Sequence, residues 1–124
     1  MSLLDPDEQE QASTLASMAA RAESRSSGSL FELGYRMAVI AGTPPLEGLA
    51  LPVGPRALVA ALDAGARALP LSQAHKLILY RAIDVQVLAH GESFYDALNG
   101  HYLAHGILPG FRVYPAVPSG RAHV

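Results

Sequence analysis

The sequence predicts an all-α fold, a compact bundle of four to five helices, from three observations. Half of the 124 residues are hydrophobic, enough for a core without metal or disulfide support. Only 6% are aromatic and none is Trp, so Leu, Ala, Ile and Val must build that core, which favours helix packing. Apolar residues recur at helical spacing between Pro and Gly breakers, and no strand-like alternation stands out.

The first predicted helix spans residues 5–26. Asp5 is a suitable N-cap, and Pro6 suits the first helical position. Its apolar face is thin and rich in Ala, so we expect this helix to dock loosely. The second helix is predicted to open at Ser29 and Glu32, which have capping-box spacing, and to end at Gly42.

The third helix is predicted from Pro55 to Pro70, and Gly65 within it suggests a close helix contact. The fourth, about 72–89, is apolar on most sides, which is typical of a helix at the centre of a fold. The fifth, about 92–105, is predicted to end at Gly106. Residues 1–110 therefore form one predicted domain, and 111–124 a predicted extended or flexible tail.

Composition and charge set several function classes aside. The chain has no Cys, so disulfides, thiol catalysis and thiolate metal sites are excluded. Its net charge of −2 offers no electrostatic footprint for nucleic acid. The apolar run 77–80 is too short for membrane insertion, and the acidic N-terminus lacks a secretion-signal pattern. We therefore expect a cytoplasmic protein.

Few residues suggest chemistry. His101 and His105, one helical turn apart, are weak candidates for metal ligands, because no third ligand stands at matching spacing; the other interpretation is that they cover the helix C-terminus. Ser72 and Ser93 are better explained as helix-start residues than as nucleophiles. The sequence therefore predicts no enzyme and no cofactor.

Five short segments carry a family resemblance. They are 36–42 (RMAVIAG), 54–58 (GPRAL), 77–81 (LILYR), 94–99 (FYDALN) and 106–109 (GILP). In order and spacing they resemble the central segment of a bacterial family known as domain of unknown function 1631, over most of residues 1–110. Members of that family are typically longer, and some carry the label thymidine phosphorylase. The resemblance implies no mechanism, but it implies that some apolar surface serves a neighbouring segment.

Two functional hypotheses follow. The first is a non-enzymatic interaction or structural module that binds a protein partner or itself; its candidate contact residues are Glu92, Asp96, Asn99, Arg36 and Arg56. Residues 92, 96 and 99 form a polar ridge, which is either a solvated face or a recognition surface. The alternative is a ligand-binding module in nucleotide signalling, which requires Arg21, Arg25, Arg36 and Arg56 to converge on one pocket.

Overall fold

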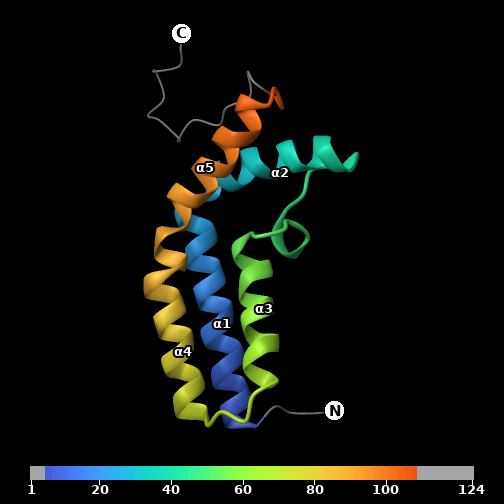
Figure 1. Ribbon diagram of the computed structural model, residues 1–124. Helices are drawn as coiled ribbons and strands as arrows, with labels where there is room; N and C mark the ends of the chain where they lie inside the picture. Colours follow the sequence, from blue (N-terminus) through green and yellow to red (C-terminus); the bar gives the residue numbers. More distant parts are fainter. Residues whose placement is uncertain (1–4, 109–124) are drawn as a thin grey trace, which may run out of the picture.

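A computed structural model describes residues 5–108, and every regular element in that range is helical (Figure 1). The elements in chain order are α1 (Pro6–Arg25), α2 (Ser27–Ala41), the 3-10 turn η1 (Gly48–Ala50), α3 (Pro55–Arg67), α4 (Gln73–Gln86), the 3-10 turn η2 (Leu88–His90) and α5 (Gly91–Ala104). The predicted all-α class is confirmed. The tail expected at 111–124 lies outside the described residues.

The helices form two groups. In Figure 1, α1 lies between α3 and α4, and α2 and α5 pack together at one end of these three. The larger core joins α1, α3 and α4 around Met18 and Tyr80. A smaller core lies around Leu33, Leu51 and Tyr95 and connects α2, the η1 segment and α5.

The central helix is α1, not the fourth helix as predicted. Five α1 side chains are buried, whereas Tyr80 is the one buried residue of α4. The physical reason lies in side-chain size, because Ala19 and Ala22 allow α3 and α4 to approach α1 closely from two sides. The thin, Ala-rich face for which we expected loose docking is therefore buried between α3 and α4.

The capping residues in the sequence predict several helix ends correctly. The Asp5 side chain accepts a hydrogen bond from the Glu8 backbone N–H at 2.8 Å, and the Ser72 side chain accepts one from the His75 N–H at 3.2 Å. Gly42 and Gly106 end α2 and α5 with φ of +71° and +80°, a conformation that suits Gly.

The predicted capping box at Ser29 and Glu32 is wrong. Only Ser26 separates α1 from α2, so both residues lie inside α2. The hydroxyl of Ser29 donates instead to the Asp96 carboxylate on α5. A tertiary contact between α2 and α5 has taken the place of the local cap.

The close approach predicted at Gly65 occurs at Gly34. Nothing lies within 4 Å of a Cβ built on Gly65, whereas a Cβ on Gly34 would stand 2.2 Å from the Leu46 carbonyl oxygen. The Leu46 N–H also donates to the Gly34 carbonyl at 3.3 Å. The chain after Pro44 and Pro45 is thereby held against α2.

No helix among residues 5–108 is both long and apolar enough to cross a membrane.

Candidate interaction surfaces

The outward face of α4 is apolar. Ala74, Ile78, Ala82 and Val85 recur every three or four residues, so they form one stripe along the helix, and all four are exposed. The exposed fraction is 66% for Ile78 and 52% for Val85. In Figure 1, α4 lies on the side of α1 opposite to α3, so α1 covers its inner side. The stripe is an apolar helix surface with no neighbouring helix in the described part of the chain.

Arg81 lies beside this stripe and is exposed next to Ala82. Lys76 is half-buried on the opposite side of α4. The acidic Asp84 is already paired, because its carboxylate accepts from Arg21 of α1 at 2.8 Å. An incoming helix would therefore meet an apolar stripe with the positive charge of Arg81 at one edge.

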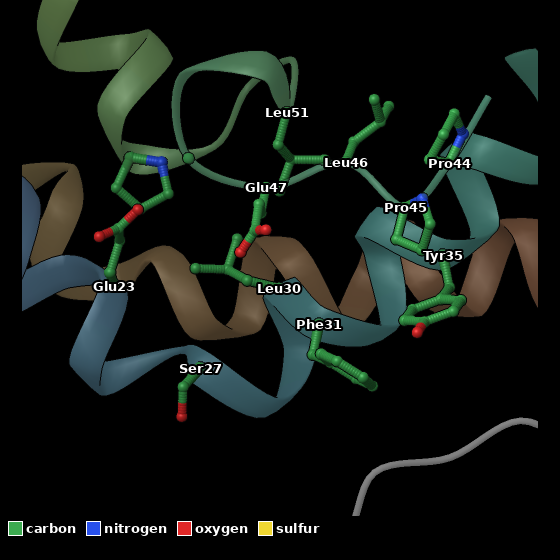
Figure 2. A pocket seen from close by; sticks show the side chains of 12 residues that line it. Glu23, Ser27, Leu30, Phe31, Tyr35, Pro44, Pro45, Leu46, Glu47 and Leu51 are labelled. Atoms are coloured by element: carbon green, nitrogen blue, oxygen red, sulfur yellow. The ribbon is translucent and has the colours of Figure 1, made fainter.

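A second surface is a groove of about 650 Å³ between α2 and the segment Pro44–Leu51 (Figure 2). Leu30, Phe31 and Tyr35 of α2 line one side, and Pro44, Pro45 and Leu46 line the other. The Phe31 and Tyr35 ring centroids are 4.9 Å apart, and Phe31 is 50% exposed. Aromatic rings and prolines therefore make much of the lining of this groove apolar.

The carboxylates of the groove differ in their pairing. Glu23 accepts a hydrogen bond from Arg56 of α3 at 2.9 Å, so its charge is balanced. Glu47 is exposed, and its side chain points into the groove in Figure 2. No Lys or Arg is among the residues that line the groove within the described chain. The groove is therefore acidic around Glu47.

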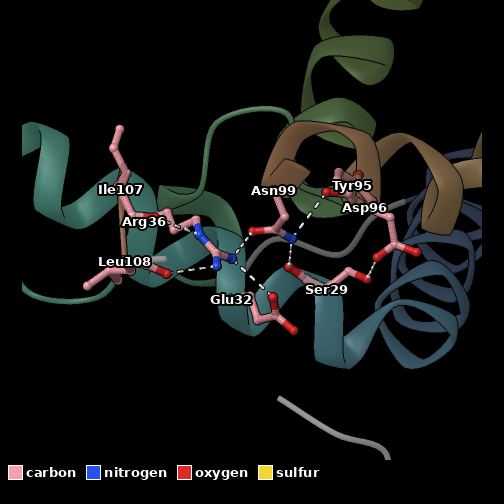
Figure 3. Close-up of polar contacts among 8 residues, drawn as sticks. All are labelled: Ser29, Glu32, Arg36, Tyr95, Asp96, Asn99, Ile107 and Leu108. Atoms are coloured by element: carbon pink, nitrogen blue, oxygen red, sulfur yellow. Dashed lines mark hydrogen bonds and ion pairs between the residues drawn. The ribbon is translucent and has the colours of Figure 1, made fainter. Parts of the chain in front are cut away.

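Arg36 and Asn99, two of the predicted contact residues, are buried against each other (Figure 3). The Arg36 guanidinium donates to Glu32 at 3.0 Å, to Asn99 at 2.9 Å, and to the Ile107 and Leu108 carbonyls at 3.0 Å each. The Asn99 amide donates to the Ser29 and Tyr95 carbonyls. These residues join α2 to α5 and to the turn after it, so they hold the fold together rather than face a partner.

The polar ridge predicted on the fifth helix is therefore divided. Glu92 and Asp96 are exposed, whereas Asn99 points inward. Asp96 is engaged by the Ser29 hydroxyl at the surface. One feature of the sequence could have predicted that Arg36 is buried. Arg36 lies in an apolar segment between Leu33 and Met37, where a buried charge needs hydrogen-bonding partners such as Asn99.

The four arginines of the alternative hypothesis do not converge. Arg21 pairs with Asp84, Arg56 pairs with Glu23, Arg36 is buried beneath α5, and Arg25 is exposed on α1. None of them lines the large groove. Within residues 5–108 they do not form a common anion site.

The weak metal candidates His101 and His105, and the serines predicted to start helices, have local contacts. His105 Nδ1 lies 2.8 Å from the backbone carbonyl of His101, and both imidazoles are exposed. The described residues hold no group of three His, Cys, Asp or Glu side chains placed to bind a metal. Ser72 caps α4, and the Ser93 hydroxyl donates to the His90 carbonyl at 3.1 Å.

Two buried tyrosines have perturbed acidity. Burial, with a smaller contribution from Glu23, raises the pKa of Tyr95 to about 12. The Tyr95 hydroxyl donates to the Val53 carbonyl at 2.7 Å. Val53 has a φ of +58°, an unfavourable conformation for a β-branched residue. Burial also raises the pKa of Tyr80, whose hydroxyl has no protein partner among the described residues.

A family model described as "Protein of unknown function (DUF1631) N-terminal domain" matches residues 1–106. No curated protein and no solved structure matches the chain. The predicted resemblance is confirmed, with the matched part being the N-terminal domain of the family rather than a central segment. The match covers most of the sequence, and the chain belongs to the DUF1631 family.

Proposed function

We propose that this chain is a non-catalytic module that binds an amphipathic helix of a protein partner on the outward face of α4. One observation carries the proposal: Ile78 and Val85 lie on a continuous apolar stripe and are more than half exposed. Full burial of such a side chain contributes about 1.5–3 kcal/mol, so covering the exposed parts of both gains about 2–4 kcal/mol. Ala74 and Ala82, between and beside them, allow a second helix to approach closely.

The basic edge of the stripe indicates the chemistry of the partner. Arg81 favours a helix whose apolar stripe is flanked by Asp or Glu. A second copy of α4 fits less well. An antiparallel copy that sets Ile78 against Val85 brings the two Arg81 side chains together beside the two-fold axis, where like charges repel.

The family supports this function in one respect. The matched model is described as an N-terminal domain, so proteins of the family contain a further part that can supply such a helix. Tethering would raise the effective concentration of a weakly binding helix to the millimolar range. The residues of the large groove also favour binding over catalysis, since its lining is mostly apolar.

Designed peptides test the proposal. Two helical peptides share one Leu/Ile stripe, flanked by Glu in one and by Lys in the other, and their binding is followed by fluorescence anisotropy. We expect the Glu peptide to bind about tenfold more tightly or better, with the preference weakening as salt rises. The Ile78→Ser/Val85→Ser variant should lose this binding. The matched control is Leu69→Ser, which removes an exposed side chain, 56% accessible, after α3.

Three outcomes would count against it. Equal binding of both peptides refutes the predicted charge of the partner. Unchanged binding by the Ile78→Ser/Val85→Ser variant refutes the site. A dimer in light scattering that the same variant abolishes would show that a second copy, not a partner helix, covers α4.

A further inference from the structure

A cleft of about 400 Å³ lies between α1 and α4, which stand side by side in Figure 1. Gln73 of α4 donates to Glu10 of α1 at 3.0 Å near the start of both helices. Arg21 pairs with Asp84 at 2.8 Å near their ends, so the two helices run in the same direction. Val85 belongs both to the apolar stripe of α4 and to the lining of this cleft. A helix that covers the stripe therefore also reaches the edge of the cleft.

The charges that line the cleft differ along its length. Arg21, Arg81 and Asp84 lie toward one end, and Glu10 lies toward the other. Glu10 precedes Arg21 by eleven residues on α1, which is about 16 Å along the helix and beyond the Debye length of about 8 Å at physiological salt. Asp84 is paired with Arg21, whereas Arg81 has no ion pair within residues 5–108. One positive charge is therefore unbalanced at the arginine end.

Arg21 retains the capacity for a second contact. A guanidinium has five N–H donors, and one nitrogen of Arg21, Nη2, donates to Asp84. The Arg21 side chain is 53% exposed, so its remaining donors are accessible from outside. Arg81 stands one helical turn before Asp84 and is exposed as well. The two guanidinium groups flank one carboxylate and have donors left for another.

We propose that this cleft binds a carboxylate side chain of the partner helix, held by Arg81 and by the remaining donors of Arg21. The inference rests on the function proposed for α4 and adds a specific subsite to it. Arg21 makes α1 part of the partner surface, although the partner helix packs on α4. The methylene groups of the acidic side chain cover Leu77, a half-buried residue that lines the cleft.

The competing occupant is a free anion such as inorganic phosphate. Asp84 repels any anion at this end, and a single unbalanced cation at a solvent-exposed site contributes little on its own. A carboxylate on the partner helix gains in addition from the apolar contacts that its helix makes with Ile78 and Val85, whereas a free anion has no such contacts. The carboxylate of a helix is therefore the favoured occupant.

Fluorescence anisotropy with two helical peptides tests the subsite. Both peptides carry the same Leu/Ile stripe, flanked by Glu in one and by the uncharged Gln in the other. Arg81→Gln and Arg21→Gln should each weaken binding of the Glu peptide about threefold to fivefold, because each removes donors to its carboxylate. Neither variant should change binding of the Gln peptide.

Asp84→Asn distinguishes a binding role of the arginines from a structural one. It removes the repelling carboxylate and releases Arg21, so we expect the Glu peptide to bind about threefold more tightly or better. Loss of the contact between α1 and α4 alone would leave binding unchanged or weaken it. The matched control is Asp63→Asn on α3, which makes the same charge change and releases Arg67 from a similar pair at 2.8 Å, but outside the cleft. It should leave the affinity unchanged.

Equal effects of Asp84→Asn and Asp63→Asn would overturn the inference, because the gain would then follow net charge alone. Unchanged binding of the Glu peptide by Arg21→Gln would show that α1 takes no part. Saturable binding of inorganic phosphate in calorimetry, abolished by Arg81→Gln, would assign the cleft to a free anion instead. These outcomes leave the effect of Ile78→Ser/Val85→Ser intact, whereas peptides that fail to bind at all would overturn the α4 proposal together with this one.

Discussion

Replacing Arg36 with Met tests whether the buried polar network, rather than apolar packing alone, joins α2 to α5. Arg36 is 1% exposed and donates to two side chains and two carbonyls. Met keeps most of the apolar stem but leaves the Glu32 carboxylate and the Asn99 oxygen without this donor. The Ile107 and Leu108 carbonyls are only half-buried, so water can replace their lost bonds.

The cost follows from the charge that remains. Breaking a buried ion pair from one side costs about 3–5 kcal/mol, and the Glu32 side chain is 12% exposed, so its partial hydration brings the expected value to about 3 kcal/mol. That is a large share of the roughly 5–15 kcal/mol that stabilises a domain. Urea unfolding followed by far-ultraviolet circular dichroism measures the loss as a lower midpoint at unchanged slope.

A double variant separates the two explanations. Glu32→Leu/Arg36→Met also removes the carboxylate that Arg36 no longer neutralises, so it should recover at least about half of the stability lost in Arg36→Met. Arg36→Lys keeps the charge but not the forked geometry, and should fall between Met and wild type. A loss below about 1 kcal/mol in Arg36→Met, or no recovery in the double variant, would refute the argument that loss of the Arg36–Glu32 ion pair dominates.

Three further predictions concern buried groups. Tyr95→Phe should cost about 1–2 kcal/mol in urea unfolding because it strands the Val53 carbonyl, whereas Tyr80→Phe should be neutral or stabilising because that hydroxyl has no protein partner in the described chain; the reverse order would contradict both assignments. The raised pKa of Tyr95 means that the unfolded chain loses this proton first, so stability should fall between about pH 10 and pH 12, and Tyr95→Phe should flatten that fall in the unfolding midpoint. Gly34→Ala should cost about 2 kcal/mol or more despite the better helix propensity of Ala, because the Leu46 carbonyl must move; a stabilised Gly34→Ala in thermal unfolding would contradict this close approach.

The parts of the fold that the sequence predicted correctly are those that local chemistry determines. Asp5, Ser72, Gly42 and Gly106 act within one turn of their own helix, so their roles follow from neighbouring residues. The Ser29 capping box failed because Asp96, far away in sequence, competes for the same hydroxyl. Such competition depends on how helices pack, which periodicity does not encode.

The candidate site residues also divide into those that local sequence predicts and those that depend on tertiary contacts. Glu92 and Asp96 are exposed, as a polar ridge predicts, but Asn99 one turn away belongs to the buried network. The groove depends on Gly34, where a missing side chain lets Leu46 approach the helix backbone. Nothing in the sequence around Gly34 marks it as a contact point, because the partner backbone follows a separate turn through Pro44 and Pro45.

The wrong prediction that α4 is the central helix bears most directly on function. Its composition indicates burial on several sides, and α1 covers only its inner side in the described chain. A helix that needed only a solvated outer face could carry charged residues at positions 78 and 85 without loss of packing, as α1 does at several of its exposed positions. The exposed parts of Ile78 and Val85 contribute no burial free energy until a second apolar surface covers them. Arg81 beside them favours a partner surface with acidic residues next to its apolar ones. Ile78→Lys/Val85→Lys should therefore leave the free energy of unfolding of the isolated chain within about 0.5 kcal/mol of wild type while abolishing binding of the Glu-flanked helix. A large loss of stability would show instead that the stripe already packs within the chain.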